Sequence, residues 1–114
     1  MPTWDDVVAI AKRLPEVEET TSWQTPSLKV KGRFFARLRT EAEGGLALVC
    51  DPSEKAALLA SADPAFYTTP HYDGYAMILI HLDRIDEPRL TDLIEDAWLI
   101  KAPVGLRKTY ERRQ

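Results

Sequence analysis

Five basic residues lie within a window of eleven residues that contains no acid. They are Lys29, Lys31, Arg33, Arg37 and Arg39. Lysine and arginine neutralise phosphate groups, and a two-stranded ribbon has a shape that fits a groove of DNA. The alternative is that these residues form the solvated face of an edge hairpin, where lysine discourages pairing with other chains. The window predicts a DNA-binding hairpin, with the ordinary exposed hairpin as its alternative.

Two further bases, Arg107 and Lys108, follow near the end of the sequence. They extend the predicted DNA-binding surface if the last segment folds back beside the hairpin. A basic tail that only keeps the protein in solution is the alternative. The sequence alone does not place the tail and the hairpin together.

A second group combines aromatic and titratable side chains in segments that flank predicted strands. Its members are Trp23, His71, Tyr72 and Tyr75. Exposed aromatic rings stack on nucleic acid bases or line a pocket for a small molecule. The alternative is packing, because tryptophan and tyrosine are often buried and His71 beside Pro70 then only stabilises a turn.

Signatures of catalysis and of cofactor binding are missing from the sequence. It has no G-x-S-x-G, no Walker-type loop and no G-x-G-x-x-G, and its only histidines, His71 and His81, do not have the spacing of a metal site. We therefore expect a non-enzymatic protein without catalytic residues, metal or cofactor. An enzyme that uses His71 as acid or base near Tyr72 and Asp73 is the alternative.

Length and composition are those of one globular domain. With 114 residues, 45% hydrophobic and 29% charged, we expect a single domain over residues 1–114. Cys50 is the only cysteine, which fits a reducing compartment and therefore a cytoplasmic location. No secretory signal or membrane-spanning run is visible, so we expect no membrane partner.

Charge is distributed unevenly along the chain. The formal net charge is −3, yet twelve acids and only three bases lie between residues 41 and 100, whereas residues 25–40 carry five bases and no acid. This distribution argues against a surface that is basic all round and allows one localised basic face. The acidic part favours the alternative function, an adaptor that binds a protein or a small molecule.

Hydrophobic periodicity and turn residues predict a mixed α+β protein. A helix capped by Thr3 runs to Pro15, and residues 20–26, after an acidic loop at 16–19, form a short strand or an ordered connection with Pro26 at an edge or bend. The remaining predicted elements are a hairpin at 27–39, a strand at 46–50, a helix at 52–62, strands at 66–68 and 75–82, a helix at 88–101 and a C-terminal tail. They predict a two-layer, mostly antiparallel five-stranded sheet with helices packed on it, in the order α-β3-α-β2-α.

The alternation within the hairpin also predicts which residues share a face. Leu28 shares a face with Phe34, Ala36 and Leu38 only if the loop at Gly32 has an odd number of residues, as in a bulged three-residue turn. The opposite face then carries Lys29, Phe35, Arg37 and Arg39.

Several local patterns together resemble the MmcQ/YjbR family of small bacterial proteins. The residues that carry the resemblance are Leu14-Pro15-x-Val17-Glu18-Glu19, Ser22-Trp23-x-Thr25-Pro26 with Lys29-Val30, Phe34-Phe35-Ala36, Thr69-Pro70-His71-Tyr72-x-Gly74-Tyr75, and Ala97-Trp98 with Ala102-Pro103. The resemblance implies a frataxin-like (CyaY-like) fold and a "double-wing" mode in which hairpins contact DNA. This chain departs from a DNA-binding pattern in being acidic overall.

Together these features predict a non-enzymatic DNA-binding or DNA-associated module. The basic hairpin contacts phosphates, and Trp23 or Tyr72 is available for stacking on bases.

Overall fold

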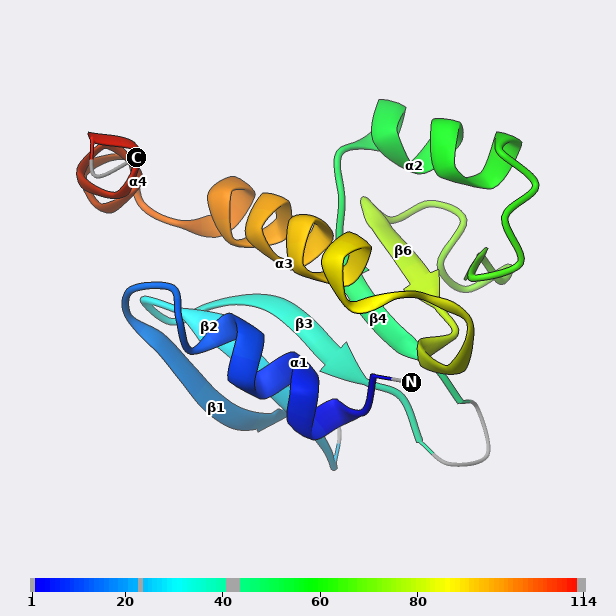
Figure 1. The fold of residues 1–114 in the computed structure, drawn as a ribbon, viewed down its shortest axis with the longest axis horizontal. Coiled ribbons are helices and arrows are strands. Elements are labelled where there is room, and N and C mark those ends of the chain that lie inside the picture. The colour runs from blue at the N-terminus through cyan, green and yellow to red at the C-terminus, as the bar shows by residue number, and fades with distance from the viewer. Residues whose placement is uncertain (1, 23, 41–43, 113–114) are drawn as a thin grey trace.

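The computed structural model describes residues 2–22, 24–40 and 44–112 (Figure 1). Its elements are α1 (Trp4–Ala11), β1 (Val17–Ser22), β2 (Thr25–Val30), β3 (Arg33–Leu38), β4 (Leu46–Val49), α2 (Pro52–Ala60), β5 (Phe66–Tyr67), β6 (Met77–Ile80), a 3-10 turn at Leu82–Arg84, α3 (Glu87–Lys101) and α4 (Val104–Arg112). Within these ranges the strands form one sheet of six, in the order β1-β2-β3-β4-β6-β5, and every pair is antiparallel. The predicted α+β class with an antiparallel sheet is confirmed, whereas the predicted number of five strands is wrong.

The additional strand is β1, which begins at Val17, inside the segment that the sequence predicts as an acidic loop. Val17 packs against the core, and Glu19, two residues on, reaches Lys12 of the helix side at 2.8 Å. The acids are tolerated because an edge strand leaves them in water.

Pro26 lies in β2, an interior strand, which corrects its expected place at an edge. It is accommodated because pairing of β2 with β3 starts only at Ser27.

The β2–β3 hairpin differs from the predicted three-residue turn. Val30 pairs with Arg33, so the loop has only two residues, Lys31 and Gly32, both with positive φ (49° and 78°). Such two-residue turns match the right-handed twist of the flanking strands. The irregularity lies inside the ladder instead, because Lys29 pairs with Phe34 and Leu28 pairs with Ala36, so that Phe35 is an extra residue.

That bulge changes which hairpin residues are buried. Phe35 and Ala36, although adjacent in sequence, both enter the main core and are fully buried. Phe34 falls on the same side as Lys29, its partner in the ladder. The predictions that Phe35 lies on the side of the basic residues and that Phe34 lies on the side of Leu28 are therefore wrong. Arg37 lies on the predicted face, the one that does not carry Leu28.

Helix starts follow the capping signals in the sequence, whereas α1 ends at Ala11, before the predicted stop at Pro15. The Thr3 backbone N–H donates to the Asp6 carboxylate at 2.8 Å, and the Asp86 carboxylate accepts from the Arg89 backbone N–H at 2.8 Å. The apolar stripe of α3 is buried and consists of Leu90, Leu93, Ile94, Ala97 and Trp98. The tail forms a helix, α4, whose Tyr110 packs on Trp98 with ring centroids 4.9 Å apart.

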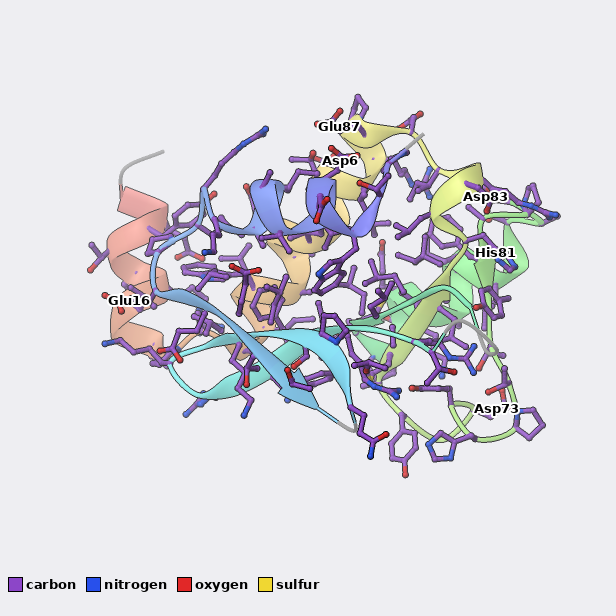
Figure 2. All side chains as sticks on the ribbon, turned by 90° about the horizontal axis from the view of Figure 1, so that it is seen from below. Asp6, Glu16, Asp73, His81, Asp83 and Glu87 are labelled. Carbon is purple, nitrogen blue, oxygen red and sulfur yellow. The ribbon has the colours of Figure 1, made fainter. Side chains whose placement is uncertain are left out.

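The sheet has one covered face and one open face. Figure 2 shows α1 and α3 on one side of the strands and the loop that contains Asp73 on the other side. On the covered face, helix and strand side chains form the main core, whereas on the open face a small cluster of Ala47, Tyr72 and Leu79 is buried. No helix of the described residues is long and apolar enough to cross a membrane.

Candidate functional site

A row of paired residues runs across the open face of the sheet. Each member is in register with the next: Thr20, Ser27, Arg37, Ala47, Leu79 and Tyr67. Cross-strand partners point to the same side of a sheet, so all six side chains belong to the open face. The row places Arg37 near its centre, with the small side chains of Ser27 and Ala47 on either side of it.

Arg37 and Arg39 are held around Tyr72. The Arg37 guanidinium donates from Nε to the Thr25 hydroxyl at 2.9 Å and from Nη1 to the Tyr72 hydroxyl at 3.0 Å. The Arg39 guanidinium lies 5.4 Å from the centroid of the Tyr72 ring, a cation–π geometry. Both arginines are half-buried and Tyr72 is buried, so these charges are positioned rather than freely solvated.

Tyr67 holds Arg39 from the other side. Its hydroxyl accepts from Arg39 Nη1 at 3.2 Å and donates to the Gly44 carbonyl at 3.2 Å. Its ring stacks on His81 with centroids 4.1 Å apart. Gly45, with φ of 85°, lies so close to the Tyr67 hydroxyl that a side chain would not fit there. The glycine pair therefore lets tyrosine and arginine meet at this end of the sheet.

Three residues at or beside this site were not predicted from the sequence: Thr25, Tyr67 and Lys55. Lys55 lies on α2, is only 7% exposed, and its Nζ donates to the carbonyls of Tyr72 at 2.7 Å and Tyr75 at 2.8 Å. A third contact reaches the Asp73 carbonyl at 3.4 Å. The three donors of one ammonium group thus hold the loop that carries Tyr72. A signal was available, because Lys55 shares the helical phase of the apolar Leu58 and Leu59.

Two exposed rings form the rim of the open face. Tyr75 is 52% exposed and His71 is exposed. The His71 ring centroid lies 5.0 Å from that of Tyr72 and 5.5 Å from that of Tyr75. Three of the four aromatic residues singled out in the sequence are therefore neighbours, and the fourth, Trp23, lies outside the described residues.

The basic residues of the hairpin are not brought to one place. Lys31 is exposed in the turn and its Nζ lies 3.7 Å from the Glu16 carboxylate. Arg33 is on the covered side, where its Nη1 donates to the Lys101 carbonyl at 3.4 Å. Lys29 has the parity of the open face and is half-buried, opposite Glu18 of β1. Only Arg37 and Arg39 join the tyrosines.

The tail bases lie on α4, at the same end of the molecule as the β2–β3 turn (Figures 1 and 2). Arg107 donates to the Leu99 carbonyl at 3.4 Å, and Lys108 is exposed. Arg33 and Lys101 provide the contact between hairpin and C-terminal region, so the tail approaches the hairpin on the covered side and not at the open face.

We define the open-face site as Thr25, Arg37, Arg39, Tyr67 and Tyr72 with the rim residues His71 and Tyr75. A guanidinium is a planar fork of N–H donors that matches phosphate and carboxylate oxygens, and tyrosine or histidine rings stack on planar groups. This arrangement suits an anionic ligand that also carries flat rings.

Comparisons with known proteins identify a family model, curated relatives and a solved structure that are similar to this chain. The YjbR family model matches residues 12–100. Uncharacterised proteins of Mycobacterium tuberculosis (strain H37Rv) and Mycobacterium bovis are each 33% identical over 124 residues, which covers 96% of this chain and 96% of theirs. The crystal structure of a Deinococcus radiodurans protein superposes on this chain with a TM-score of 0.78 at 23% identity, over 99% of this chain and 88% of that one. That protein carries the family-model domain DUF419. This last likeness supports the fold.

Proposed function

We propose that this chain, which belongs to the YjbR family, is a non-enzymatic DNA-binding module that contacts DNA through the open-face site. One observation carries the proposal. Arg37 and Arg39 are fixed around Tyr72 in the middle of a sheet face that helices leave uncovered, with exposed rings at its rim. Many proteins bind nucleic acid strands through cationic side chains that lie beside aromatic rings on an uncovered sheet face.

The geometry favours a single strand over a duplex. A hairpin that enters a groove of a duplex presents its basic side chains along the whole ribbon. Here Lys31 instead forms an ion pair with Glu16, and Arg33 donates to the C-terminal end of α3. A single strand, by contrast, lies across a sheet, with phosphates on the arginines and bases stacked on His71 or Tyr75. The proposed surface is therefore the sheet face and not the hairpin turn.

The first test is binding of fluorescent single-stranded and duplex DNA, followed by fluorescence polarisation from about 50 to 200 mM salt. The variant is the double substitution Arg37→Gln and Arg39→Gln. We expect single-strand affinity to fall about tenfold or more. The slope of log affinity against log salt should also flatten, by about one for each phosphate that the variant no longer neutralises.

A charge-matched control carries Arg13→Gln and Arg84→Gln, two exposed residues outside the open-face site. Because it changes the net charge equally, it separates local contact from general attraction, and its affinity should stay within about twofold of the parent. Equal reductions of affinity in both double variants, or no binding at the lowest salt, would contradict the proposal. Thermal unfolding of each variant checks that the fold is retained.

The second candidate is an adaptor that binds a protein or a small molecule. Its support is the half-buried state of both arginines and their bonds to Thr25 and tyrosine hydroxyls, since preorganised guanidinium groups suit a compact anion such as a phosphate monoester. A nucleoside monophosphate that raises the melting temperature and blocks single-strand binding would favour this reading. A cytoplasmic location is part of the proposal.

A further inference from the structure

A cavity of about 240 Å³ lies on the helix side of the molecule, away from the open-face site. Its lining residues come from the end of β4, the first turn of α2 and the second half of α3. Its apolar wall comes from both layers: Leu48, Ile78, Leu93 and Ile100. Ile100 is 44% exposed, so part of this wall is open to the outside.

All charged residues that line the cavity are acids. These are Asp51, Glu54 and Asp96. The Asp51 carboxylate is occupied by its own helix, where it caps α2 by accepting from the Ser53 and Glu54 backbone N–H groups at 2.9 and 3.4 Å. Glu54 and Asp96 remain as the carboxylates that can face a ligand, one from each helix.

The two acids repel each other. Burial and then the charge of Glu54 raise the pKa of the Asp96 carboxyl above its ordinary value. A cation placed between the two carboxylates would relieve that repulsion. An anion would add to it, which makes phosphate or carboxylate ligands unsuitable for this cavity.

The Cys50 thiol also lines the cavity and is only 6% exposed. Burial, followed by the charges of Glu54 and Asp51, raises its pKa to about 11. The thiol is therefore protonated at neutral pH and contributes a small, weakly polar surface rather than a metal ligand. In the described part of the chain, no group of three or more His, Cys, Asp or Glu residues is arranged to hold a metal ion.

We propose that this cavity binds a small primary amine with a compact apolar body. The ammonium group lies between Glu54 and Asp96, and the apolar body contacts Leu48, Leu93 and Ile100. The size is suitable, because an apolar cavity of about 150 Å³ in another protein holds one benzene molecule, so a cavity of about 240 Å³ accommodates a ring with an aminomethyl group. The charge of the rim selects the cation, and the apolar wall selects against hydrated metal ions.

The test is a titration of the full chain with benzylamine at neutral pH, followed by calorimetry and by amide NMR shifts. Benzyl alcohol and benzoate are the matched neutral and anionic probes. We expect saturable binding of benzylamine with shifts at Cys50, Glu54 and Ile100, binding of benzyl alcohol at least about tenfold weaker, and no binding of benzoate, since the charged contact is the discriminating one.

The variant Glu54→Gln with Asp96→Asn should weaken benzylamine binding about tenfold or more. Its charge-matched control, Asp83→Asn with Glu111→Gln, changes exposed acids that do not line the cavity and should bind as the parent does. Equal binding of benzylamine and benzyl alcohol, an equal reduction of affinity in both variants, or shifts at other residues would overturn the proposal.

The thiol supplies a second measurement that does not depend on a variant. Cys50 is the only cysteine, so the rate of its reaction with an aromatic disulfide reports on this cavity alone. Saturating benzylamine should slow the reaction in proportion to occupancy, and benzoate should not. An unchanged rate at saturation would also overturn the proposal. Neither result bears on DNA binding, because the open-face site lies on the other side of the sheet.

Discussion

The two faces of the sheet are made by the same strands and differ in what covers them. On the covered face, α1 and α3 bury a large apolar core in which Trp98 and Phe35 are fully buried. On the open face the buried cluster has only Ala47, Tyr72 and Leu79, and arginines occupy the neighbouring positions. The difference indicates that the covered face supplies most of the stability, because buried apolar area is the dominant favourable contribution to folding.

Strand β3 shows how closely the two environments lie in sequence. Phe35 and Ala36 enter the covered core, whereas Arg37, the next residue, is on the open face beside Tyr72. The bulge at Phe35 makes this possible because it places two consecutive side chains on one side. The open-face site therefore lies directly on top of the buried core, one residue away from it in the sequence.

The largest effect is expected when one aromatic residue on each side of the sheet is truncated and the losses of stability are compared. Trp98→Ala removes a fully buried ring that also donates to the Pro15 carbonyl at 3.0 Å, and should lower the free energy of unfolding by about 3–5 kcal/mol. Tyr75→Ala, which truncates a ring that is 52% exposed, should cost less than about 0.5 kcal/mol. Urea denaturation measures both. Similar reductions in the free energy of unfolding of both variants would show that the covered face does not supply most of the stability.

An intermediate effect is expected at Lys55, which links α2 to the loop of the open face. Lys55→Met leaves the carbonyls of Tyr72, Asp73 and Tyr75 without their donor, and should cost about 1–3 kcal/mol. Amide hydrogen exchange in the loop at 72–75 should accelerate more than exchange in β4.

The matched control is Lys108→Met, which replaces an exposed lysine and should change stability by no more than about 0.5 kcal/mol. Unchanged exchange of the loop in Lys55→Met would show that the open face holds Tyr72 without support from α2.

The smallest effect concerns Asp96 on the covered side. Its pKa is raised, so the folded protein binds this proton more tightly than the unfolded chain does, and stability falls as the pH rises from the ordinary carboxyl value of 3.8 through the raised value. Asp96→Asn should therefore raise the melting temperature at pH 7 by a few degrees at most. The gain should vanish near pH 3, where the carboxyl is protonated in both states.

Melting curves from about pH 3 to pH 7 check this prediction, with Asp83→Asn as the exposed control. A lower melting temperature of Asp96→Asn at pH 7 would mean that this carboxylate has a stabilising partner, and would contradict the repulsion between Asp96 and Glu54.

Local signals are sufficient to predict much of the fold. The caps at Thr3 and Asp86, the buried stripe of α3 and the hairpin around Gly32 depend on residues within a few positions of one another, and all are present in the structure. The true start of strand β1 does not follow from such signals, because its acids are typical of a loop and only the pairing with β2 makes Val17 part of a strand.

The sequence by itself determined the α+β class, the capped helices and the family resemblance, because these follow from short-range patterns. Only the tertiary structure decided which charges meet. The five basic residues of one window lie in three different environments: the hairpin turn, the covered side and the open face. Arg37 contacts Tyr72, which is 35 positions away in the sequence. The register shift at Phe35 and the buried Lys55 depend on pairing and packing over long distances, where no local pattern carries the information.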